Sequence, residues 1–122
     1  MKKILIADDE VDALKFLEKR LKLEKYGVTA VNNSGDVIKL AKSDKPDLFI
    51  LDIAMPGMDG YALAATMRKD SELKNIPVIF ITGKEFVPKA MEEITRDAGA
   101  YDYIMKPCSF EEILSKVQTV LG

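Results

Sequence analysis

The most informative segment of this chain is LFILDIAMPGMDG, residues 48–60. The apolar run Leu48–Leu51 leads into a single acid, Asp52, and a turn-rich run follows. A continuous apolar run of this length is typical of a parallel strand that is buried on both faces. Pro56 and Gly57 are already residues that favour a turn, so the turn does not need Asp52 in order to form. The segment therefore predicts a buried strand with a functional residue, Asp52, at its carboxyl end.

Three other apolar runs of the chain end in polar or charged residues. They are Ile4–Ala7 before Asp8 and Asp9, Val78–Ile81 before Thr82, and residues 103–105 before Lys106 and Pro107. The carboxyl ends of parallel strands open onto the sheet edge where ligands bind. We therefore expect three carboxylates, a hydroxyl and an ammonium to converge in one pocket. That set suits a divalent cation and a phosphoryl group better than it suits packing.

Strand-like and helix-like segments alternate along the whole chain. The strand-like segments are Ile4–Ala7, Val28–Val31, Leu48–Leu51, Val78–Ile81 and Tyr101–Met105. The helix-like segments are Val11–Lys25, Asp36–Lys42, Tyr61–Lys69, Phe86–Ala98 and Phe110–Leu121. This alternation predicts an α/β fold of right-handed βαβ units, with helices on both faces of a parallel sheet. Five strands favour an open doubly wound sheet over a closed barrel, which needs about eight.

The expected helix boundaries rest on spacing and on capping residues. One face of the first helix is expected to join Val11, Leu14, Leu17 and Leu21. Gly27 and Gly99 follow helices at positions where a left-handed backbone is expected. Ser34 is expected to cap the second helix, and Ser109 to open a capping box before the last one.

Length and composition narrow the class of protein. The chain has 122 residues, which predicts one domain over residues 1–122. A net charge of -2 argues against a nucleic-acid surface, and no apolar run is long enough to predict a membrane span. We expect no signal peptide, because no cleavage site follows Met1 before the first strand. The single cysteine, Cys108, fits a reducing, cytoplasmic compartment, and the absence of histidine excludes histidine catalysis.

Asp8 and Asp9 lie at an expected strand-to-helix turn and have two readings. An aspartate there can cap the helix by accepting hydrogen bonds from its N–H groups. However, Glu10 and Asp12 follow, and this many neighbouring acids exceeds what a cap needs. A bound cation would relieve their mutual repulsion. Mg²⁺ is the natural candidate, because it takes one or two carboxylates together with phosphate oxygens.

Two interpretations, one structural and one functional, are also open for each of Asp52, Thr82 and Lys106. Alone, Asp52 or Thr82 could simply bond its own turn, and Lys106 could lie in a solvated loop. In the predicted pocket, Asp52 could accept a phosphoryl group, Thr82 could donate a hydrogen bond to it, and Lys106 could face it as a point charge. Gly83 would let the backbone approach that group closely. Pro107 is a candidate for a cis peptide bond that fixes the aim of Lys106.

At these residues the chain resembles the receiver domain of bacterial response regulators, the CheY-like family. The resemblance covers essentially all of residues 1–122 and rests on the order and spacing of its motifs. The motifs are Asp8-Asp9, residues 51–60, Thr82 and residues 103–107. The family implies a flavodoxin-like (βα)5 fold with strand order 2-1-3-4-5. That order places the first and third strands side by side, which brings Asp8, Asp9 and Asp52 together.

The resemblance implies an acceptor and a metal site. Asp52 would accept a phosphoryl group from a phosphohistidine of a separate histidine kinase or phosphotransfer protein, as in two-component signal transduction. Mg²⁺ would be bound directly by Asp9 and through water by Asp8. Asp52 and the backbone carbonyl of Ala54 would complete the protein ligands.

The resemblance further implies a signalling switch rather than an enzyme. Lys106 and Thr82 would bind the phosphoryl group, and Tyr103 would swing inward as Thr82 moves. The expected output face comprises Phe86–Ala98, Tyr101–Met105 and Phe110–Leu121. It would contact an unidentified downstream protein, with the chain acting as a monomer or a weak homodimer. The absence of a linker after the last expected helix slightly favours a stand-alone protein.

Two other functions stay open at the level of sequence. One is a Mg²⁺-dependent phosphatase, although the acids lack Asp-x-Asp spacing and no long insertion could form a substrate cap. The other is a receiver-shaped interaction module that works without phosphorylation, against which the complete acidic set argues. The chain departs from the family pattern at Ala54 and Gly83. Together with Lys84, which follows Gly83, these residues border the expected pocket, so the lifetime of the phosphoryl group stays open.

Overall fold

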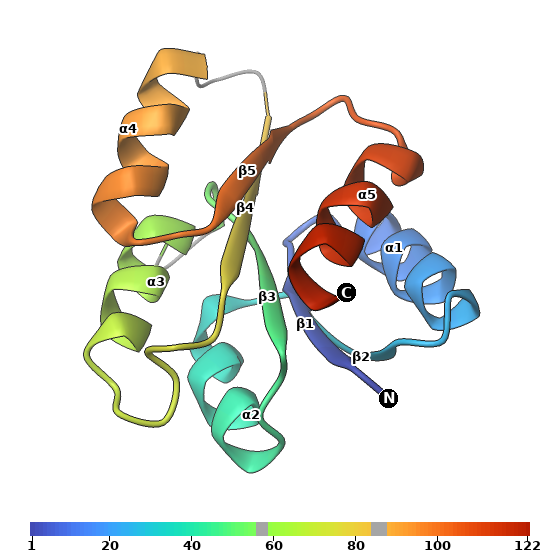
Figure 1. Ribbon diagram of the computed structural model, residues 1–122, viewed down its shortest axis with the longest axis horizontal. Helices are drawn as coiled ribbons and strands as arrows, with labels where there is room; N and C mark the ends of the chain where they lie inside the picture. Colours follow the sequence, from blue (N-terminus) through green and yellow to red (C-terminus); the bar gives the residue numbers. More distant parts are fainter. Residues whose placement is uncertain (56–58, 84–87) are drawn as a thin grey trace.

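The computed structural model describes residues 1–55, 59–83 and 88–122 and has the predicted α/β architecture (Figure 1). Its strands are β1 (Lys3–Ala7), β2 (Gly27–Val31), β3 (Leu48–Asp52), β4 (Val78–Thr82) and β5 (Asp102–Met105). Its helices are α1 (Val11–Leu23), the short 3-10 helix η1 (Ser34–Asp36), α2 (Val37–Ser43), α3 (Gly60–Arg68), α4 (Pro88–Ala98) and α5 (Phe110–Leu121). Within these ranges, every helix is too short or too polar to cross a bilayer.

The sheet is parallel throughout, with the order β2-β1-β3-β4-β5, which confirms the predicted topology. Strands β3 and β4 are buried at every position, whereas the edge strands β2 and β5 are mostly half-buried. Helices cover both faces of the sheet, so the side chains of the central strands are in apolar surroundings on either side. This explains why the two central strands read as unbroken apolar runs.

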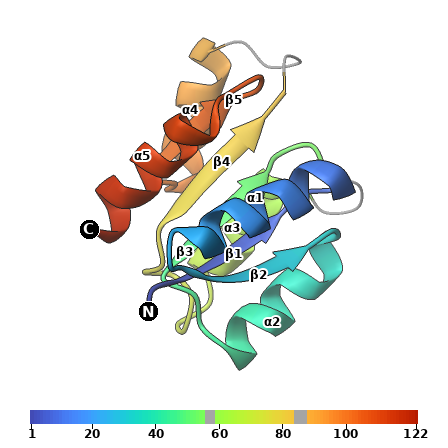
Figure 2. The same ribbon diagram turned by 90° about the vertical axis from the view of Figure 1, so that its right-hand side faces the viewer.

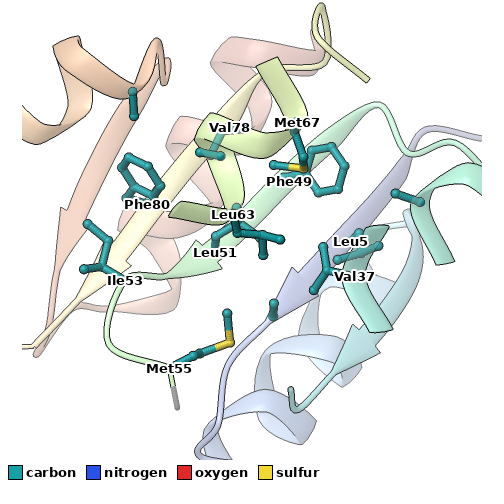
Figure 3. Close-up of a cluster of buried hydrophobic side chains, with 14 of the residues drawn as sticks. Leu5, Val37, Phe49, Leu51, Ile53, Met55, Leu63, Met67, Val78 and Phe80 are labelled. Atoms are coloured by element: carbon teal, nitrogen blue, oxygen red, sulfur yellow. The ribbon is translucent and has the colours of Figure 1, made fainter. Parts of the chain in front are cut away.

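Two apolar cores lie on opposite faces of the sheet. Helices α2, α3 and α4 cover one face, and α1 and α5 cover the other (Figures 1 and 2). Figure 3 shows the first core, in which Phe49 and Phe80 of the sheet lie near Leu63 and Met67 of α3. The two cores hold the strands in a fixed register, so the carboxyl ends of β1, β3 and β4 are also fixed relative to one another.

The end of the first helix differs from the expectation. Helix α1 stops at Leu23, and the left-handed residue is Lys25, with a φ of 73°, rather than Gly27. Gly27 already belongs to β2, where its N–H donates to the carbonyl of Lys2, so it has no role in ending the helix. At Gly99 the prediction is confirmed, with a φ of 69°. Val11, at the first position of α1, is 44% exposed, whereas the other three residues of the expected face are buried.

Capping residues were predicted with mixed success. The side chain of Asn33, not of Ser34, accepts a hydrogen bond from the N–H of Asp36, and η1 forms before α2 begins. Asn33 has the extended backbone that a cap requires, whereas Ser34 is already helical. The Ser109 Oγ accepts from the N–H of Glu112 at 3.1 Å, as predicted. Helix α4 begins at Pro88 in the described part of the chain, and its expected start, Phe86, lies outside the described residues.

Gly60 brings the start of α3 against the end of β3. A Cβ at this position would lie 2.6 Å from the carbonyl oxygen of Asp52 and 2.9 Å from the Cα of Ile53. The Gly60 N–H donates to the Ile53 carbonyl at 3.1 Å. Only glycine, which has no Cβ, permits so close an approach. The approach holds the start of α3 against the end of β3.

We expect Gly60→Ala to lower the free energy of unfolding by roughly 1–3 kcal/mol, because the added methyl overlaps rigid backbone atoms. Urea unfolding measures the change. The matched control is Gly27→Ala, whose Cβ would come closest to the sulfur of Met1, at 3.3 Å, and Met1 is 89% exposed. Equal stability of the two variants would show that Gly60 is not required by packing.

Candidate functional site

The acids of the first and third strands converge at the carboxyl edge of the sheet. Strands β1 and β3 pair directly, with Ala7 opposite Leu51, so Asp8 and Asp52 extend from neighbouring strand ends. One carboxylate oxygen from each of Asp8, Asp9 and Asp52 lies within 4.8 Å of the others. Asp8 and Asp52 are each only 5% exposed, whereas Asp9 is exposed. The predicted convergence of the three carboxylates is therefore confirmed.

Lys106 reaches the same cluster from the loop after β5. Its Nζ donates to Asp8 Oδ2 at 3.0 Å and lies 3.8 Å from Glu10 Oε1. Burial lowers the pKa of Lys106, but the hydrogen bond and charge of Asp8, aided by Asp52 and Glu10, outweigh it and raise the pKa above its ordinary value. The ammonium therefore stays charged. The peptide bond between Lys106 and Pro107 is cis, as predicted.

Asp52 has few polar partners for so buried an acid. Its Oδ1 accepts from the N–H of Ala54 at 3.0 Å. Burial raises the pKa of Asp52 to about 6; the Ala54 hydrogen bond and the Lys106 charge oppose the rise, and the charge of Asp8 adds to it. A carboxylate in this setting is incompletely stabilised as an anion, so a further cation at the site would favour its charged form.

Thr82 ends β4, between the strands that carry Asp52 and Lys106. It is fully buried, and its Oγ1 has no hydrogen-bond partner among the described residues. A buried hydroxyl without a partner costs free energy, so such a group in a native site calls for an explanation. An acceptor that is bound only in another state would provide one.

Tyr103 lies on β5 opposite Phe80, and Met105 lies opposite Thr82. Tyr103 is half-buried and packs against the core on the face covered by α4. It is therefore on the strand next to Thr82. Gly83 is half-buried beside Thr82, and Lys84 lies outside the described residues.

The donor set fits a hard divalent cation. Asp8 is already engaged through both oxygens, because Oδ1 accepts from the Glu10 N–H at 2.9 Å and Oδ2 accepts from Lys106. The Asp9 carboxylate has no ion pair or hydrogen bond within the described ranges. Carboxylate oxygens at this spacing are what Mg²⁺ prefers, with water filling further positions.

Glu10 is the site residue that the sequence did not single out. It counted only as one more acid in a run, yet its carboxylate is the second acid near Lys106. The one sequence feature that could have predicted a place for Glu10 at the site is its position directly after Asp8-Asp9. Cys108 has a pKa raised mainly by burial, which supports an inert apolar role for the thiol.

We expect Asp52→Asn to raise the free energy of unfolding near pH 8 without metal, by on the order of 2 kcal/mol. The pKa of Asp52 is about 6 in the folded protein against 3.8 for the free group, so the wild type loses stability as pH rises through that window. The difference should therefore shrink toward zero near pH 4. Urea unfolding in EDTA across that range measures it.

Asp97→Asn is the control for this experiment, since the side chain of Asp97 is 62% exposed. Its stability should follow the wild type at each pH. A constant difference between wild type and Asp52→Asn at every pH would show that ionisation of Asp52 is not its cause.

The sequence and the fold were compared with those of known proteins. Residues 4–118 match the response regulator receiver domain family. Protein PilH of Pseudomonas aeruginosa is 35% identical over 122 residues, which cover 100% of this chain and 99% of PilH. The transcriptional regulatory protein PcoR of Escherichia coli is 33% identical over 99% of this chain and 52% of its own length. "Probable transcriptional regulator ycf27" of Guillardia theta is 36% identical over 98% of this chain and 45% of its own length. The chain thus spans about half the length of several curated relatives that it matches.

Solved structures give the same picture. The chemotaxis response regulator CheY4 of Vibrio cholerae superposes with a TM-score of 0.90 at 26% identity, covering 99% of both chains. The response regulator TrrA of Thermotoga maritima, solved in complex with Mg²⁺ and BeF, has a TM-score of 0.84 at 31% identity over 99% of this chain and 100% of TrrA. The chain therefore belongs to the response regulator receiver domain family of two-component signal transduction, as its motifs predicted.

Proposed function

We propose that the receiver domain formed by residues 1–122 is a switch controlled by a phosphoryl group on Asp52. The donor is a phosphohistidine of a sensor histidine kinase or of a phosphotransfer protein. The Asp52 carboxylate attacks phosphorus, and the phosphoryl group passes to its oxygen as the bond to the donor nitrogen breaks. A cytoplasmic location, which the single cysteine favours, belongs to the same proposal.

The acids hold Mg²⁺ in this proposal. Asp9, which has no other partner among the described residues, binds it directly, and Asp8 assists through water because both of its oxygens are engaged. Asp52 and the backbone carbonyl of Ala54 complete the protein ligands. Bound Mg²⁺ would supply positive charge where the equatorial phosphoryl oxygens gather negative charge.

Lys106 and Thr82 bind the transferred group. Lys106 places its Nζ 3.0 Å from Asp8, and it neutralises a phosphoryl oxygen. Thr82 donates its unpartnered hydroxyl to another phosphoryl oxygen. The domain acts only on its own Asp52, both when it gains the group and when it loses it, and so has no turnover of an external substrate.

The single observation that carries this proposal is the convergence of the buried Asp8 and Asp52 with the exposed Asp9 beside the Lys106 ammonium. A structural role would not need two carboxylates at 5% exposure on adjacent strand ends, because like charges there destabilise the fold. An interaction module that works without phosphorylation would have no use for this arrangement.

Intact-mass measurement after treatment with acetyl phosphate and Mg²⁺ tests the proposal. The wild type should gain one phosphoryl group, and Asp52→Asn should gain none. Asp59→Asn is the matched control: Asp59 accepts from the Ala62 N–H to cap α3, which asparagine can also do, so this variant should be modified like the wild type. An unmodified wild type would instead favour the phosphorylation-independent module.

The output of the switch is the face made by α4, β5 and α5. Phosphorylation gives Thr82 a new partner, and Tyr103, on the next strand, moves inward as Thr82 moves. The Lys116–Asp102 ion pair ties α5 to β5, so movement of this strand reaches the helix. A downstream protein reads the change, and the domain acts as a monomer or a weak homodimer. Residues 86 and 87 of the face lie outside the described residues.

Hydrogen exchange tests the output face. With Mg²⁺ and beryllofluoride as a phosphoryl mimic, amide exchange should change in Asp102–Met105 and Phe110–Leu121, because a shifted strand end alters their packing. Helix α2 (Val37–Ser43) lies against another part of the sheet and serves as the internal control. Changes confined to the residues around Asp52 would rule out transmission to this face.

A further inference from the structure

A cavity of about 440 Å³ is lined on one part of its wall by Asp8, Glu10 and Lys106. One end is lined by Asp8, Lys106 and Gly83, which belong to or border the candidate site. Its other lining residues include members of α1 and α5. These two helices cover the face of the sheet opposite α3 and α4 (Figure 1). It is large enough for an aromatic ring, since a void of about 150 Å³ already binds benzene. The cavity therefore adjoins the candidate site through Asp8 and Lys106, although Asp52 itself does not line it.

The walls of the cavity away from the acids are apolar. Helix α1 contributes Ala13, Phe16 and Leu17, and helix α5 contributes Phe110 and Ile113. Phe16 is 56% exposed, which is unusual for so large an apolar side chain beside a charged site. These apolar side chains would favour an apolar group over a charged one.

Arg20 holds the two phenylalanine rings in place. Its guanidinium carbon lies 4.3 Å from the Phe110 ring centroid and 5.6 Å from that of Phe16, distances at which a cation is attracted to an aromatic face. Arg20 thus bridges α1 and α5 at this cavity. The apolar wall is therefore formed before any ligand arrives, which lowers the cost of binding.

We propose that this cavity binds the apolar leaving group of a small acyl-phosphate donor, so that aromatic acyl phosphates modify Asp52 faster than acetyl phosphate. The inference rests on the proposed phosphorylation of Asp52. The charged phosphoryl group stays at the end with Lys106 and the acids, and the uncharged acyl body lies between α1 and α5. Charge and polarity along the cavity match the two halves of such a donor.

The transfer step is balanced without a further reactant. An oxygen of the Asp52 carboxylate bonds to phosphorus while the bond between phosphorus and the bridging acyl oxygen breaks. With benzoyl phosphate the leaving group is benzoate, which departs with the electron pair and needs no proton near neutral pH. The cavity contributes by placing the acyl group, and thereby the phosphorus, beside Asp52.

The test compares second-order rate constants for benzoyl phosphate and acetyl phosphate, measured by intact mass with Mg²⁺. The ratio of the two constants is compared between variants, so the intrinsic reactivities of the donors cancel. Ala13→Leu narrows the cavity, and Phe16→Ala removes one wall at an exposed position that the fold tolerates. Both should lower the ratio about fivefold or more, since one methylene in an apolar pocket changes specificity by about tenfold or more.

Tyr101→Ala is the control, because Tyr101 is 52% exposed and does not line the cavity. It should leave the ratio unchanged. An equal ratio in the wild type and in both cavity variants would overturn the inference while acetyl phosphate still modifies Asp52. Failure of both donors with the wild type would instead overturn the proposed function.

A binding measurement separates the cavity from the transfer step. The phosphonate analogue of benzoyl phosphate, with a methylene in place of the bridging oxygen, cannot transfer its phosphoryl group. Added to the wild type with Mg²⁺, it should shift the NMR signals of Phe16, Leu17 and Ile113, whereas the acetyl analogue should shift only signals around Asp52. Identical shifts from the two phosphonates would also overturn the inference.

Discussion

The candidate site depends on the direct pairing of β1 with β3 at the centre of the sheet. This pairing sets Asp8 and Asp52 side by side, although they are far apart in the sequence. Two buried carboxylates at that distance repel each other, and the ammonium of Lys106 offsets only part of the charge. Among the described residues, the three acids of the cluster carry more charge than the Lys106 ammonium offsets. Burial is the main cause of the raised pKa of Asp52, and the charge of Asp8 adds to the rise.

Several features of the site cost stability instead of adding to it. The Thr82 hydroxyl is buried without a partner in the described structure, and Asp52 accepts a single hydrogen bond there. Gly60 makes an approach to the Asp52 carbonyl that no other residue could make. Two cores on opposite faces of the sheet hold these groups in place. The fold thus maintains an acidic cluster beside a buried hydroxyl, and both the proposed switch and the proposed donor cavity rest on this arrangement.

Local sequence predicted a helix cap well where the whole capping motif lies within a few residues. It predicted helix ends and buried positions less well where the packing of other elements determines them. Ser109 caps α5 as predicted, because the motif is contained within four residues. Gly27 and Ser34 were wrong by one or two positions: Lys25 took the left-handed conformation and Asn33 the cap. Val11 fits the periodicity of α1, yet it lies at the helix end beyond the reach of the core. Periodicity identifies the face of a helix that is turned toward the core. It does not show which positions along that face are actually covered by the sheet.

The sequence by itself determined the alternation of strands and helices, the buried central strands and the identity of the acids, hydroxyl and ammonium at the strand ends. These follow from hydrophobic periodicity and from residue chemistry, which are local properties. Only the tertiary structure decided that Lys106 pairs with Asp8, that Glu10 lies near the same ammonium, and that Thr82 has no partner in the described structure. It also decided that a cavity with Phe16 and Phe110 in its walls adjoins the acids. These contacts join residues on different elements, and their distances depend on how the helices pack across the sheet, which no local pattern encodes.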